Sequence, residues 1–490
     1  MVAASVRVLV TGATGYIGGR LVPRLLKAGH SVRCLARDAR RLNGRFSGAE
    51  VIEGDIFDEK HLRQALDGVD ATYYLVHSMS DSHRFAERDR EAAALFGKSA
   101  REVGVQRIIY LGGLGADNAE LSHHLASRHE VGNVLRSSGV EVIEFRAAMI
   151  IGSGSISFEM MRYLTERLPL MIAPRWVTTR SQPISVADVL RYLVSALDLP
   201  HGNSRIYEIG GADIMTYRDM MLGYARLRDL RRRVVTVPLL TPRLSSYWVH
   251  LVTPISSRLA QPLILGLRNE VIVRDSTARR DFPEIAPIGF DAAVSRALDR
   301  YGAGGPDTTW FDAFDVRTLP ATFTGAREGI LIDRKERITA ATPQQVASVF
   351  TQLGGKRGWL YGNALWQLRG LLDRAFGGIG LRRGRRSATD LRLGDAVDFW
   401  RVDALEPDHH LRLRAEMKLP GKAWLEFDAD RLSDGRTRLT QTAFFEPRGL
   451  FGFLYWYLVF PFHALIFNQM ASRIVLLAEQ TPRGSTLPPS

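Results

Sequence analysis

The chain has 490 residues, 46% of them hydrophobic, and a formal net charge of +13 that comes from 65 lysines and arginines against 52 acidic residues. This length exceeds one ordinary domain, and the single cysteine, Cys34, excludes a disulfide framework and suits a reducing cytoplasm. The positive charge is compatible with nucleic acid, an anionic membrane surface or a bias toward arginine, so by itself it identifies no partner.

The first predicted element is an apolar strand that leads into a glycine-rich turn and an amphipathic helix, VRVLVTGATGYIGGR over residues 6–20. In such a turn Gly12 permits the tight bend, Gly15 lets the backbone approach a pyrophosphate, and Gly18 lets the helix pack on the strand. Because the chain runs directly into this strand, we expect no secretory signal and a cytoplasmic protein. We predict a dinucleotide site with contacts from Thr11, Gly12, Thr14, Gly15, Tyr16, Ile17 and Gly18.

The residue after the second predicted strand, over residues 30–36, indicates which dinucleotide is bound. Arg37 stands where NAD-selective folds carry an acidic residue that binds the ribose 2′-hydroxyl. A guanidinium can bind two oxygens of a 2′-phosphate, so we expect NADP(H) rather than NAD(H). Two alternatives stay open: Asp38 is the ribose acceptor, or Arg37 is a solvated loop charge.

Further strands are predicted at residues 49–53, 71–76, 107–111 and 141–145, the pattern of a doubly wound parallel sheet. The carboxyl ends of parallel strands meet at one edge of the sheet, where such folds bind cofactors. We expect Asp55 to meet the adenine. The other residues predicted to line this crevice are Ile56, Val76, His77, Ser78, Gly112 and Gly113.

Through TGATGYIG, the Gly-Asp-Ile step at residues 54–56 and the order of its strands, the chain resembles the atypical and extended short-chain dehydrogenase/reductase superfamily over roughly residues 5–300. The resemblance implies an α/β Rossmann fold with a small C-terminal substrate lobe. It also implies NADP contacts at the glycine loop, Arg37 and Asp55.

Active members of that superfamily use a Tyr-x-x-x-Lys pair after the fifth strand, and the best local match is His124-Leu125-Ala126-Ser127-Arg128. Both key positions differ, so standard carbonyl reduction is in doubt. We predict His124 as a general acid, because imidazole exchanges protons near neutral pH, and Arg128 as a holder of a ribose hydroxyl or a substrate anion. The alternative is that both residues, one helical turn apart, only contact Glu130 or solvent.

Residues 122–169 and 173–189 narrow the resemblance to bacterial two-domain NAD(P)-binding proteins, described as NmrA-like or as similar to the accessory nucleotide-binding subunit of respiratory complex I. Arg146 follows the sixth predicted strand and is a candidate substrate contact, unless it forms a surface ion pair with Glu144. Arg180 is a second candidate. It lies in a polar loop, before a helix that we expect to start at Ile184, and this loop is suited to close over a ligand.

Breakers at residues 301–307, after a helix predicted at residues 290–300, indicate a domain boundary. We predict a Rossmann domain at residues 1–212, a substrate lobe at 213–302, a linker at 303–325, a second domain at 326–480 and a disordered tail at 481–490. Prolines interrupt the apolar segment at residues 238–267, which argues against a membrane span there.

In the second domain, a strand and a helix over residues 329–350 precede alternating strands at 396–405, 410–417, 423–431 and 437–445 and a long apolar helix to Glu479. This order resembles the START-like helix-grip fold, an α+β arrangement of an antiparallel sheet around a C-terminal helix. The resemblance implies an apolar small molecule, a lipid or a quinone as ligand. His409 and His410 stand at a predicted hairpin, and we expect them to be solvated.

Residues 449–467 carry no formal charge with His463 neutral, and their length just reaches the lower bound for a bilayer span. Pro461 and the helix-grip resemblance favour a buried helix. The many aromatic residues and the basic run at residues 382–386 favour peripheral binding to an anionic membrane at its cytoplasmic face. A true span is the third alternative.

Two functions are consistent with these features. The first is an NADP-dependent oxidoreductase that acts on an apolar carbonyl, enone or quinone. The second is a non-catalytic NADP(H) sensor, or a carrier that binds a lipid or quinone. The sequence has no zinc-site spacing and no convincing nucleic-acid-binding motif, so we predict no metal site and regard nucleic acid as a minor hypothesis.

Overall fold

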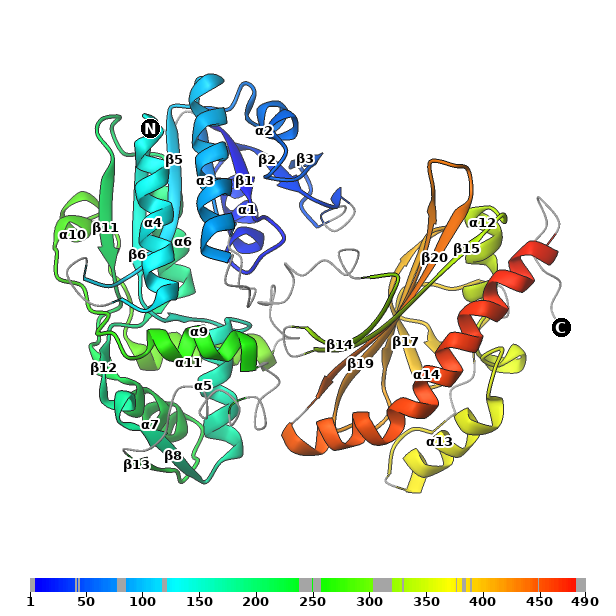
Figure 1. Ribbon diagram of the computed structural model, residues 1–490. Helices are drawn as coiled ribbons and strands as arrows, with labels where there is room; N and C mark the ends of the chain where they lie inside the picture. Colours follow the sequence, from blue (N-terminus) through cyan, green and yellow to red (C-terminus); the bar gives the residue numbers. More distant parts are fainter. Residues whose placement is uncertain are drawn as a thin grey trace. The chain divides into compact units, whose positions relative to one another are not determined.

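In the computed structural model, the described residues are 5–39, 42, 45–76, 85–116, 121–237, 249, 257–302, 320–327, 330–375, 377–380, 385–387, 390–447 and 449–481 (Figure 1). The chain divides into two compact units. The first comprises Met1–Val249 with Ser257–Phe314, and the second comprises His250–Ser256 with Asp315–Ser490.

The first unit is built on a seven-stranded parallel sheet in the order β11-β6-β5-β4-β1-β2-β3. The order reverses beside β1, so the carboxyl ends of β1 and β4 flank the point at which doubly wound folds bind dinucleotides. The predicted Rossmann class is confirmed. The strands are β1 (Arg7–Thr11), β2 (Ser31–Ala36), β3 (Glu50–Glu53), β4 (Ala71–Tyr74), β5 (Arg107–Gly113), β6 (Glu141–Ala147) and β11 (Arg205–Ile209).

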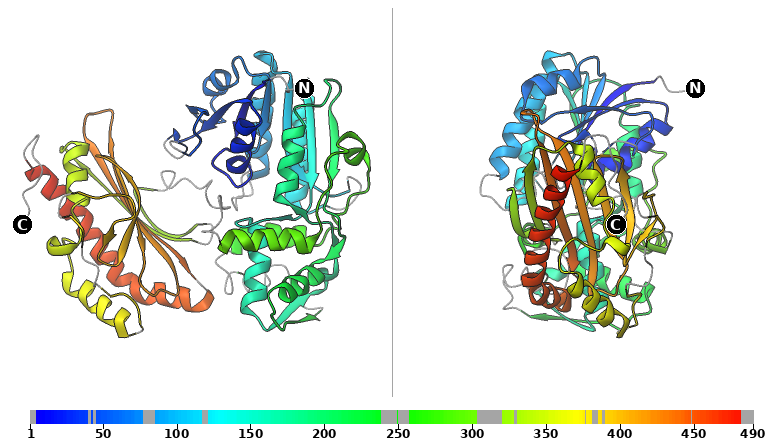
Figure 2. Two further views of the ribbon diagram at one scale, coloured as in Figure 1. Left: turned by 180° about the vertical axis from the view of Figure 1, so that it is seen from behind. Right: turned by 90° about the vertical axis from the view of Figure 1, so that its right-hand side faces the viewer.

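Helices cover both faces of this sheet, as the views from the front and from behind show (Figures 1 and 2). α1 (Gly18–Lys27) and α6 (Val186–Ser195) pack on one face, against Val8 and Val10 of β1. Leu9 instead points to the other face, which is covered by α2 (Glu59–Leu66), α3 (Phe85–Glu102) and α4 (His123–Ser137). Successive side chains of a strand point to opposite faces, so a strand buried on both sides reads as a continuous apolar run.

A smaller lobe completes the first unit and has a core of its own, which includes Phe158, Met220 and Val294. Three short strand pairs belong to it: β7 (Ile150–Ile151) with β10 (Ile184–Ser185), β8 (Leu170–Pro174) with β13 (Arg233–Val237), and β9 (Arg180–Ser181) with β12 (Met215–Thr216). The other elements are α5 (Ile156–Arg167), η2 (Arg175–Thr178), α7 (Tyr217–Leu227), α9 (Ser257–Gly266), α10 (Thr277–Asp281) and α11 (Phe290–Gly302).

The helix expected to start at Ile184 starts two residues later. Ser185 caps α6, since its hydroxyl accepts hydrogen bonds from the backbone N–H groups of Ala187 and Asp188. Ile184 and Ser185 themselves form β10. Of the apolar segment over residues 238–267, the structure describes residue 249 and residues 257–267, which include α9.

The second unit contains a seven-stranded sheet in the order β14-β15-β20-β19-β18-β17-β16, with antiparallel pairing throughout. α12 and the C-terminal part of α14 pack on it through Val346, Phe350, Met470 and Ile474. The predicted antiparallel sheet and terminal helix are present. The elements are β14 (Thr322–Arg327), β15 (Ile330–Thr339), α12 (Pro343–Phe350), η4 (Gly355–Arg357), α13 (Asn363–Ala375), β16 (Ala396–Val397), β17 (Trp400–Glu406), β18 (His410–Ala415), β19 (Gly421–Arg431), β20 (Thr437–Pro447) and α14 (Gly449–Gln480).

The strand predicted at residues 396–405 is interrupted. Asp398 adopts a left-handed backbone conformation with φ 54° between β16 and β17. Its carboxylate accepts a hydrogen bond of 2.9 Å from the Trp359 indole N–H and one of 3.2 Å from the Gly355 backbone N–H. These contacts stabilise a turn between β16 and β17, whereas the alternation of apolar residues over 396–405 predicted one continuous strand. In addition, β14 begins at Thr322, inside the stretch expected to be a linker.

The expectation that His409 and His410 are solvated is wrong, because both side chains have partners on β19. His409 Nδ1 lies 2.8 Å from the carbonyl oxygen of Ala429, and His410 Nδ1 lies 2.8 Å from a carboxylate oxygen of Asp428. Burial disfavours the charged imidazole of His410, but the hydrogen bond to Asp428 and the nearby acidic charges outweigh it and raise the pKa of His410.

The lone cysteine yields a direct test of the buried parallel sheet. Cys34 lies on β2 with none of its surface exposed, and burial raises the pKa of its thiol to about 12. Because the thiolate is the reactive form, we expect a thiol reagent to leave the native protein unlabelled and to modify one thiol after denaturation in guanidinium chloride. Rapid labelling of the native protein would contradict the placement of β2 inside the sheet.

Candidate functional site

The glycine-rich turn between β1 and α1 is tightly folded. Gly12 has φ +75°, and a Cβ at this position would lie 2.7 Å from the carbonyl oxygen of Leu75, so a side chain is excluded by both conformation and space. The Gly15 backbone N–H donates to the Gly12 carbonyl at 2.9 Å and closes the turn. The turn between strand and helix is therefore made by backbone that carries no side chain at Gly12 and Gly15.

Gly18 is the closest contact of the loop. A Cβ on Gly18 would lie 2.2 Å from the Gly12 carbonyl oxygen, which no side chain tolerates. Within described residues 5–39, α1 begins without a side-chain cap and without an acidic residue in its first turn. The N–H groups of Gly19 and Arg20 already donate to the carbonyls of Gly15 and Ile17, so the start of α1 offers a phosphate its positive dipole end, which suits a dinucleotide pyrophosphate.

The other predicted residues of this loop have different environments. Thr11 is 1% exposed, and its hydroxyl donates to the Tyr73 carbonyl at 2.8 Å, so it joins β1 to β4 rather than facing a ligand. Thr14, Gly15, Tyr16 and Ile17 are half-buried along the turn. These half-buried residues and the loop backbone stay the predicted phosphate contacts.

The carboxyl ends of β2 and β3 form the next part of the site. Arg37 directly follows β2 and is exposed, whereas Asp38 is 8% exposed. Asp55, just after β3, is half-buried and accepts a hydrogen bond of 3.1 Å from the Phe57 backbone N–H. Ile56 is buried beside it. Of the two charged residues that follow β2, Arg37 is thus the more accessible to a ligand.

The ends of β4 and β5 lie across the sheet from this point. Val76 follows β4 and is half-buried, while His77 and Ser78 lie outside the described residues. Gly112 and Gly113 end β5. A Cβ on Gly113 would lie 2.7 Å from a side-chain carbon of Leu125 on α4, so the glycine lets α4 pack closely on the strand end.

Arg128 is bound to the end of β5. Its guanidinium donates to the Leu111 carbonyl at 2.5 Å and lies 5.2 Å from the centre of the Tyr110 ring. The Tyr110 hydroxyl in turn donates to the Arg128 carbonyl at 3.0 Å. Burial raises the pKa of Tyr110 to about 12, with Arg128 acting in the opposite direction, so this hydroxyl stays neutral. Arg128 therefore fastens α4 to the sheet, in addition to any ligand contact.

Two residues beside Arg128 were missed by the sequence interpretation. His129 is 7% exposed, and its Nε2 lies 3.0 Å from the carbonyl oxygen of Gly113. Ser127 is 3% exposed, and its hydroxyl has no hydrogen-bond partner in the described part of the chain. The spacing of Leu125, His129 and Gly132 is the i, i+4, i+7 pattern of a buried helix face. This spacing is the sequence feature that predicts burial of His129.

His124 occupies the first turn of α4, after the capping residue Ser122, and is half-buried. Beside it, Leu125 packs in an apolar cluster with Leu114 and Val271, which come from the end of β5 and from the lobe. Leu121, Ala148 and Val273 are partly buried against the same cluster. His124 is therefore the neighbour in sequence of a buried apolar residue.

Arg146 forms the ion pair with Glu144 that the sequence offered as an alternative, but the pair is buried rather than on the surface. Its guanidinium donates to Glu144 at 2.8 Å, and the two side chains are 4% and 0% exposed. Arg136 of α4 also pairs with Glu144. Removal of one partner from a buried ion pair costs about 3–5 kcal/mol of stability. Arg146 is thus bound within the fold, and its predicted substrate contact is not what this conformation presents.

Arg180 lies on β9 of the lobe and its side chain is 57% exposed, with an ion pair of 2.8 Å to Glu270. The structure therefore gathers the glycine loop, the ends of β2 to β5 and the start of α4 along the carboxyl edge of the sheet, and places Arg180 on the lobe. Among the described residues, no cluster of three or more His, Cys, Asp or Glu side chains could hold a metal ion.

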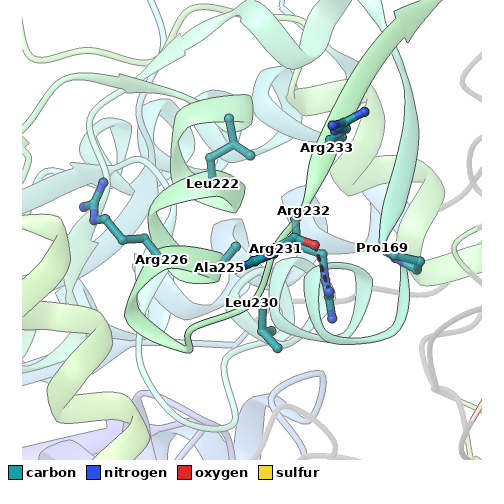
Figure 3. Close-up of a pocket in the computed structure, with 8 residues that line it drawn as sticks. All are labelled: Pro169, Leu222, Ala225, Arg226, Leu230, Arg231, Arg232 and Arg233. Atoms are coloured by element: carbon teal, nitrogen blue, oxygen red, sulfur yellow. Dashed lines mark hydrogen bonds between the residues drawn. The ribbon is translucent and has the colours of Figure 1, made fainter.

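A cavity of about 430 Å³ lies elsewhere, between α7 and β13 (Figure 3). Two of its arginines are engaged within the fold: Arg226 pairs with Asp291 at 2.8 Å, and Arg232 donates to the carbonyls of Thr165 and Glu166 at the end of α5. None of its lining residues belongs to the glycine loop or to α4, so the candidate site is assigned from loop geometry rather than from this hollow. The lining residues are Pro169, Leu222, Ala225, Arg226, Leu230, Arg231, Arg232 and Arg233.

Comparison with protein families assigns both units. Residues 12–200 match the NAD(P)H-binding family model, and this range includes the glycine loop from Gly12 onward, the ends of β2 to β5 and α4. Residues 326–470 match a protein family of unknown function, DUF2867, which covers most of the second unit.

The chain is similar to proteins that are named as two reductases and a sterol demethylase protein. One is a (4-alkanoyl-5-oxo-2,5-dihydrofuran-3-yl)methyl phosphate reductase of Streptomyces griseus, 29% identical over 46% of this chain and 75% of its own length. Another is sterol demethylase protein B of Methylococcus capsulatus, 26% identical over 57% of this chain and 84% of its own length. Among solved structures, a triphenylmethane reductase of Citrobacter sp. has 17% identity and a TM-score of 0.49, over 60% of this chain and 99% of its own.

The close contact at Gly18 gives a test of the cofactor cradle. Gly18→Ala forces the start of α1 away from Gly12, and overpacking of this kind costs about 1–3 kcal/mol of stability. We expect NADPH affinity, measured by fluorescence titration, to fall at least about tenfold because the N–H groups move. Gly202→Ala is the control, since a Cβ there meets only the end of a flexible arginine at 3.4 Å. Unchanged NADPH binding by Gly18→Ala would refute the assigned cradle.

Proposed function

Because the chain joins an NAD(P)H-binding domain of the atypical short-chain dehydrogenase/reductase type to a C-terminal DUF2867 domain, we propose that it is an NADP(H)-dependent oxidoreductase that acts on an apolar carbonyl or quinone-like substrate. The observation that carries the proposal is the bare glycine cradle, with His124 and an apolar cluster at the same edge of the sheet.

The preference for NADP(H) rests on the end of β2. Arg37 is exposed there, whereas Asp38, the alternative partner of a ribose hydroxyl, is buried. A guanidinium binds phosphate oxygens through two parallel hydrogen bonds, and its charge complements a 2′-phosphate. A ribose without that phosphate offers Arg37 no anion, so NAD(H) should bind more weakly.

In the proposed reaction, bound NADPH supplies the hydride that adds to the substrate carbonyl carbon. His124 donates a proton to the carbonyl oxygen, so the product is the alcohol and the imidazole is recharged from solvent. Its half-buried place in the first turn of α4 gives it access to both ligand and water. Arg128 acts by positioning, since its bonds to the Leu111 carbonyl and the Tyr110 ring hold α4 against the end of β5.

The substrate class follows from the surroundings of His124. Leu125, the residue after His124 on α4, packs in a buried apolar cluster with Leu114 and Val271. Apolar surface of this kind selects for apolar ligands. The name of one relative, sterol demethylase protein B, is consistent with this class, whereas the reductase of Streptomyces griseus is named for an alkanoyl-substituted furanone that also carries a methyl phosphate.

A second candidate function is NADP(H) binding without catalysis, in a sensor or in a carrier of a lipid or quinone. The observation that favours it is the hydrogen bond from Arg128 to the Leu111 carbonyl, because Arg128 stands at the position of the lysine of the Tyr-x-x-x-Lys pair in active members of the superfamily. This function predicts NADPH binding without substrate-dependent oxidation. A sensor further requires that its ligand bind with different affinity in the oxidised and reduced cofactor states.

Replacement of His124 distinguishes the two functions. We expect wild-type protein to oxidise NADPH with a member of a panel of quinones and apolar ketones, and His124→Ala to lower kcat at least about a hundredfold while NADPH affinity stays within about twofold. His123→Ala is the matched control, because this neighbouring histidine is exposed. Full activity of His124→Ala would remove His124 from the mechanism. Tight NADPH binding by a wild-type protein that is inert toward the panel would favour the second function.

A further inference from the structure

α14 is a helix of 32 residues whose two halves have different environments. Met470, Ala471, Ile474 and Ala478, in the C-terminal half, are fully buried in the core of the second unit. In the other half, Phe453 and Trp456 pack against Leu331 and Phe445 of the sheet. Figures 1 and 2 show the helix running along one side of the antiparallel sheet. One face of α14 is therefore committed to the core along most of its length.

The opposite face of the N-terminal half is exposed and apolar. The exposed fractions are 79% for Phe451, 56% for Leu454, 66% for Tyr457, 75% for Leu458, 54% for Phe462 and 49% for Leu465. These residues, with the exposed Pro461, recur at intervals of three and four and form one stripe along the helix, which we call the aromatic stripe. It contains no charged residue, although the solvent-facing side of a packed helix is ordinarily polar.

The aromatic stripe ends abruptly. Beyond Leu465, the next exposed positions of α14 are Arg473, Leu476, Glu479 and Gln480, so the outer face becomes mixed and charged. The apolar character is therefore a local property of about 14 residues, a length of roughly 21 Å at the helical rise of 1.5 Å per residue. A stripe of this length lies along a surface more readily than it fills a compact pocket.

Cations lie near the start of the stripe, and the acidic Glu446 of β20 stands opposite one of them, Lys422. No acidic residue occurs in α14 before Glu479. Lys418 and Lys422 are exposed in the segment that contacts the helix start, where a Cβ on Gly452 would lie 2.6 Å from the Pro420 carbonyl oxygen. On the neighbouring α13, the guanidinium of Arg369 lies 5.3 Å from the centre of the Tyr455 ring. A partner that meets the stripe also meets these cations.

We propose that the aromatic stripe docks the second unit on the surface of an anionic bilayer, with α14 lying in the plane of the interface. Phenylalanine, tyrosine and leucine are the side chains that such helices insert at the boundary between headgroups and acyl chains, and lysine and arginine bind the anionic headgroups. A complementary protein surface would instead need acidic groups opposite the cations and a polar rim around a compact core. The structure offers an elongated stripe.

The same geometry argues against a membrane span. α14 is long and apolar enough to cross a bilayer by length and composition, the one such helix in the described part of the chain. However, Phe453, Trp456, Phe467 and Met470 contribute to the core of the second unit. Insertion of the whole helix would remove these side chains from the sheet and unfold the unit, whereas docking by the stripe leaves them in place.

The test uses the full chain and vesicles of phosphatidylcholine with and without phosphatidylglycerol. We expect the protein to float with the anionic vesicles and less with the neutral ones. Leu458→Glu combined with Phe462→Glu should lower partitioning at least about tenfold, because it places two charges in the contact. Leu476→Glu is the matched control on the same helix, 46% exposed but outside the stripe, and should partition as the wild type does. Circular dichroism checks that the variants are folded.

A second measurement needs no disruptive change. Leu458→Cys and Leu476→Cys can each carry an environment-sensitive fluorophore, because the native Cys34 is buried and unreactive. Anionic vesicles should shift the emission of the label at position 458 to the blue and leave that at position 476 unchanged. Equal behaviour of the two labels, or equal flotation of the double variant and the wild type, would overturn the proposal. So would a dimer that the double variant dissociates, since it would assign the stripe to a second copy of this chain.

Discussion

The close approach of Gly18 to the Gly12 carbonyl is the constraint on which the site depends. A single added carbon would lie 2.2 Å from that oxygen, so α1 can begin where it does only because residue 18 has no side chain. This start directs the N-terminal end of α1 to the carboxyl edge of the sheet, between β1 and β4. Arg37, Asp55, Gly113 and His124, the residues proposed to share a ligand with the cradle, follow β2, follow β3, end β5 and start α4.

Several polar side chains around the cradle bind other parts of the chain and so stabilise the fold. The Thr11 hydroxyl joins two strands, Arg128 and His129 fasten α4 to β5, and Arg146 is buried with Glu144. His124 is half-buried in the first turn of α4, and Arg37 is exposed at the end of β2. The proposed chemistry therefore falls on these two side chains, with the anchored groups setting their positions.

The sequence predicted most of the parallel sheet and the glycine cradle because both follow from local patterns: apolar runs, alternation and glycine spacing. It did not predict the burial of Arg146 and Glu144, since burial of a charged pair depends on the packing of α4 across β6. Likewise, His129 and the interruption at Asp398 depend on partners distant in sequence, a strand carbonyl and the Trp359 indole. For α14, composition alone left three environments open, and the aromatic stripe became visible only once one helix face was seen to be packed.

The central claim is that the glycine cradle and Arg37 together form an NADP(H) site. It is tested most directly by fluorescence titration of the purified full-length chain with NADPH and with NADH under identical conditions. We expect saturable binding of one NADPH per chain, with NADH at least about tenfold weaker because it lacks the 2′-phosphate that Arg37 would bind. Equal affinities would contradict the role of Arg37, and absence of binding to either dinucleotide would contradict the site itself.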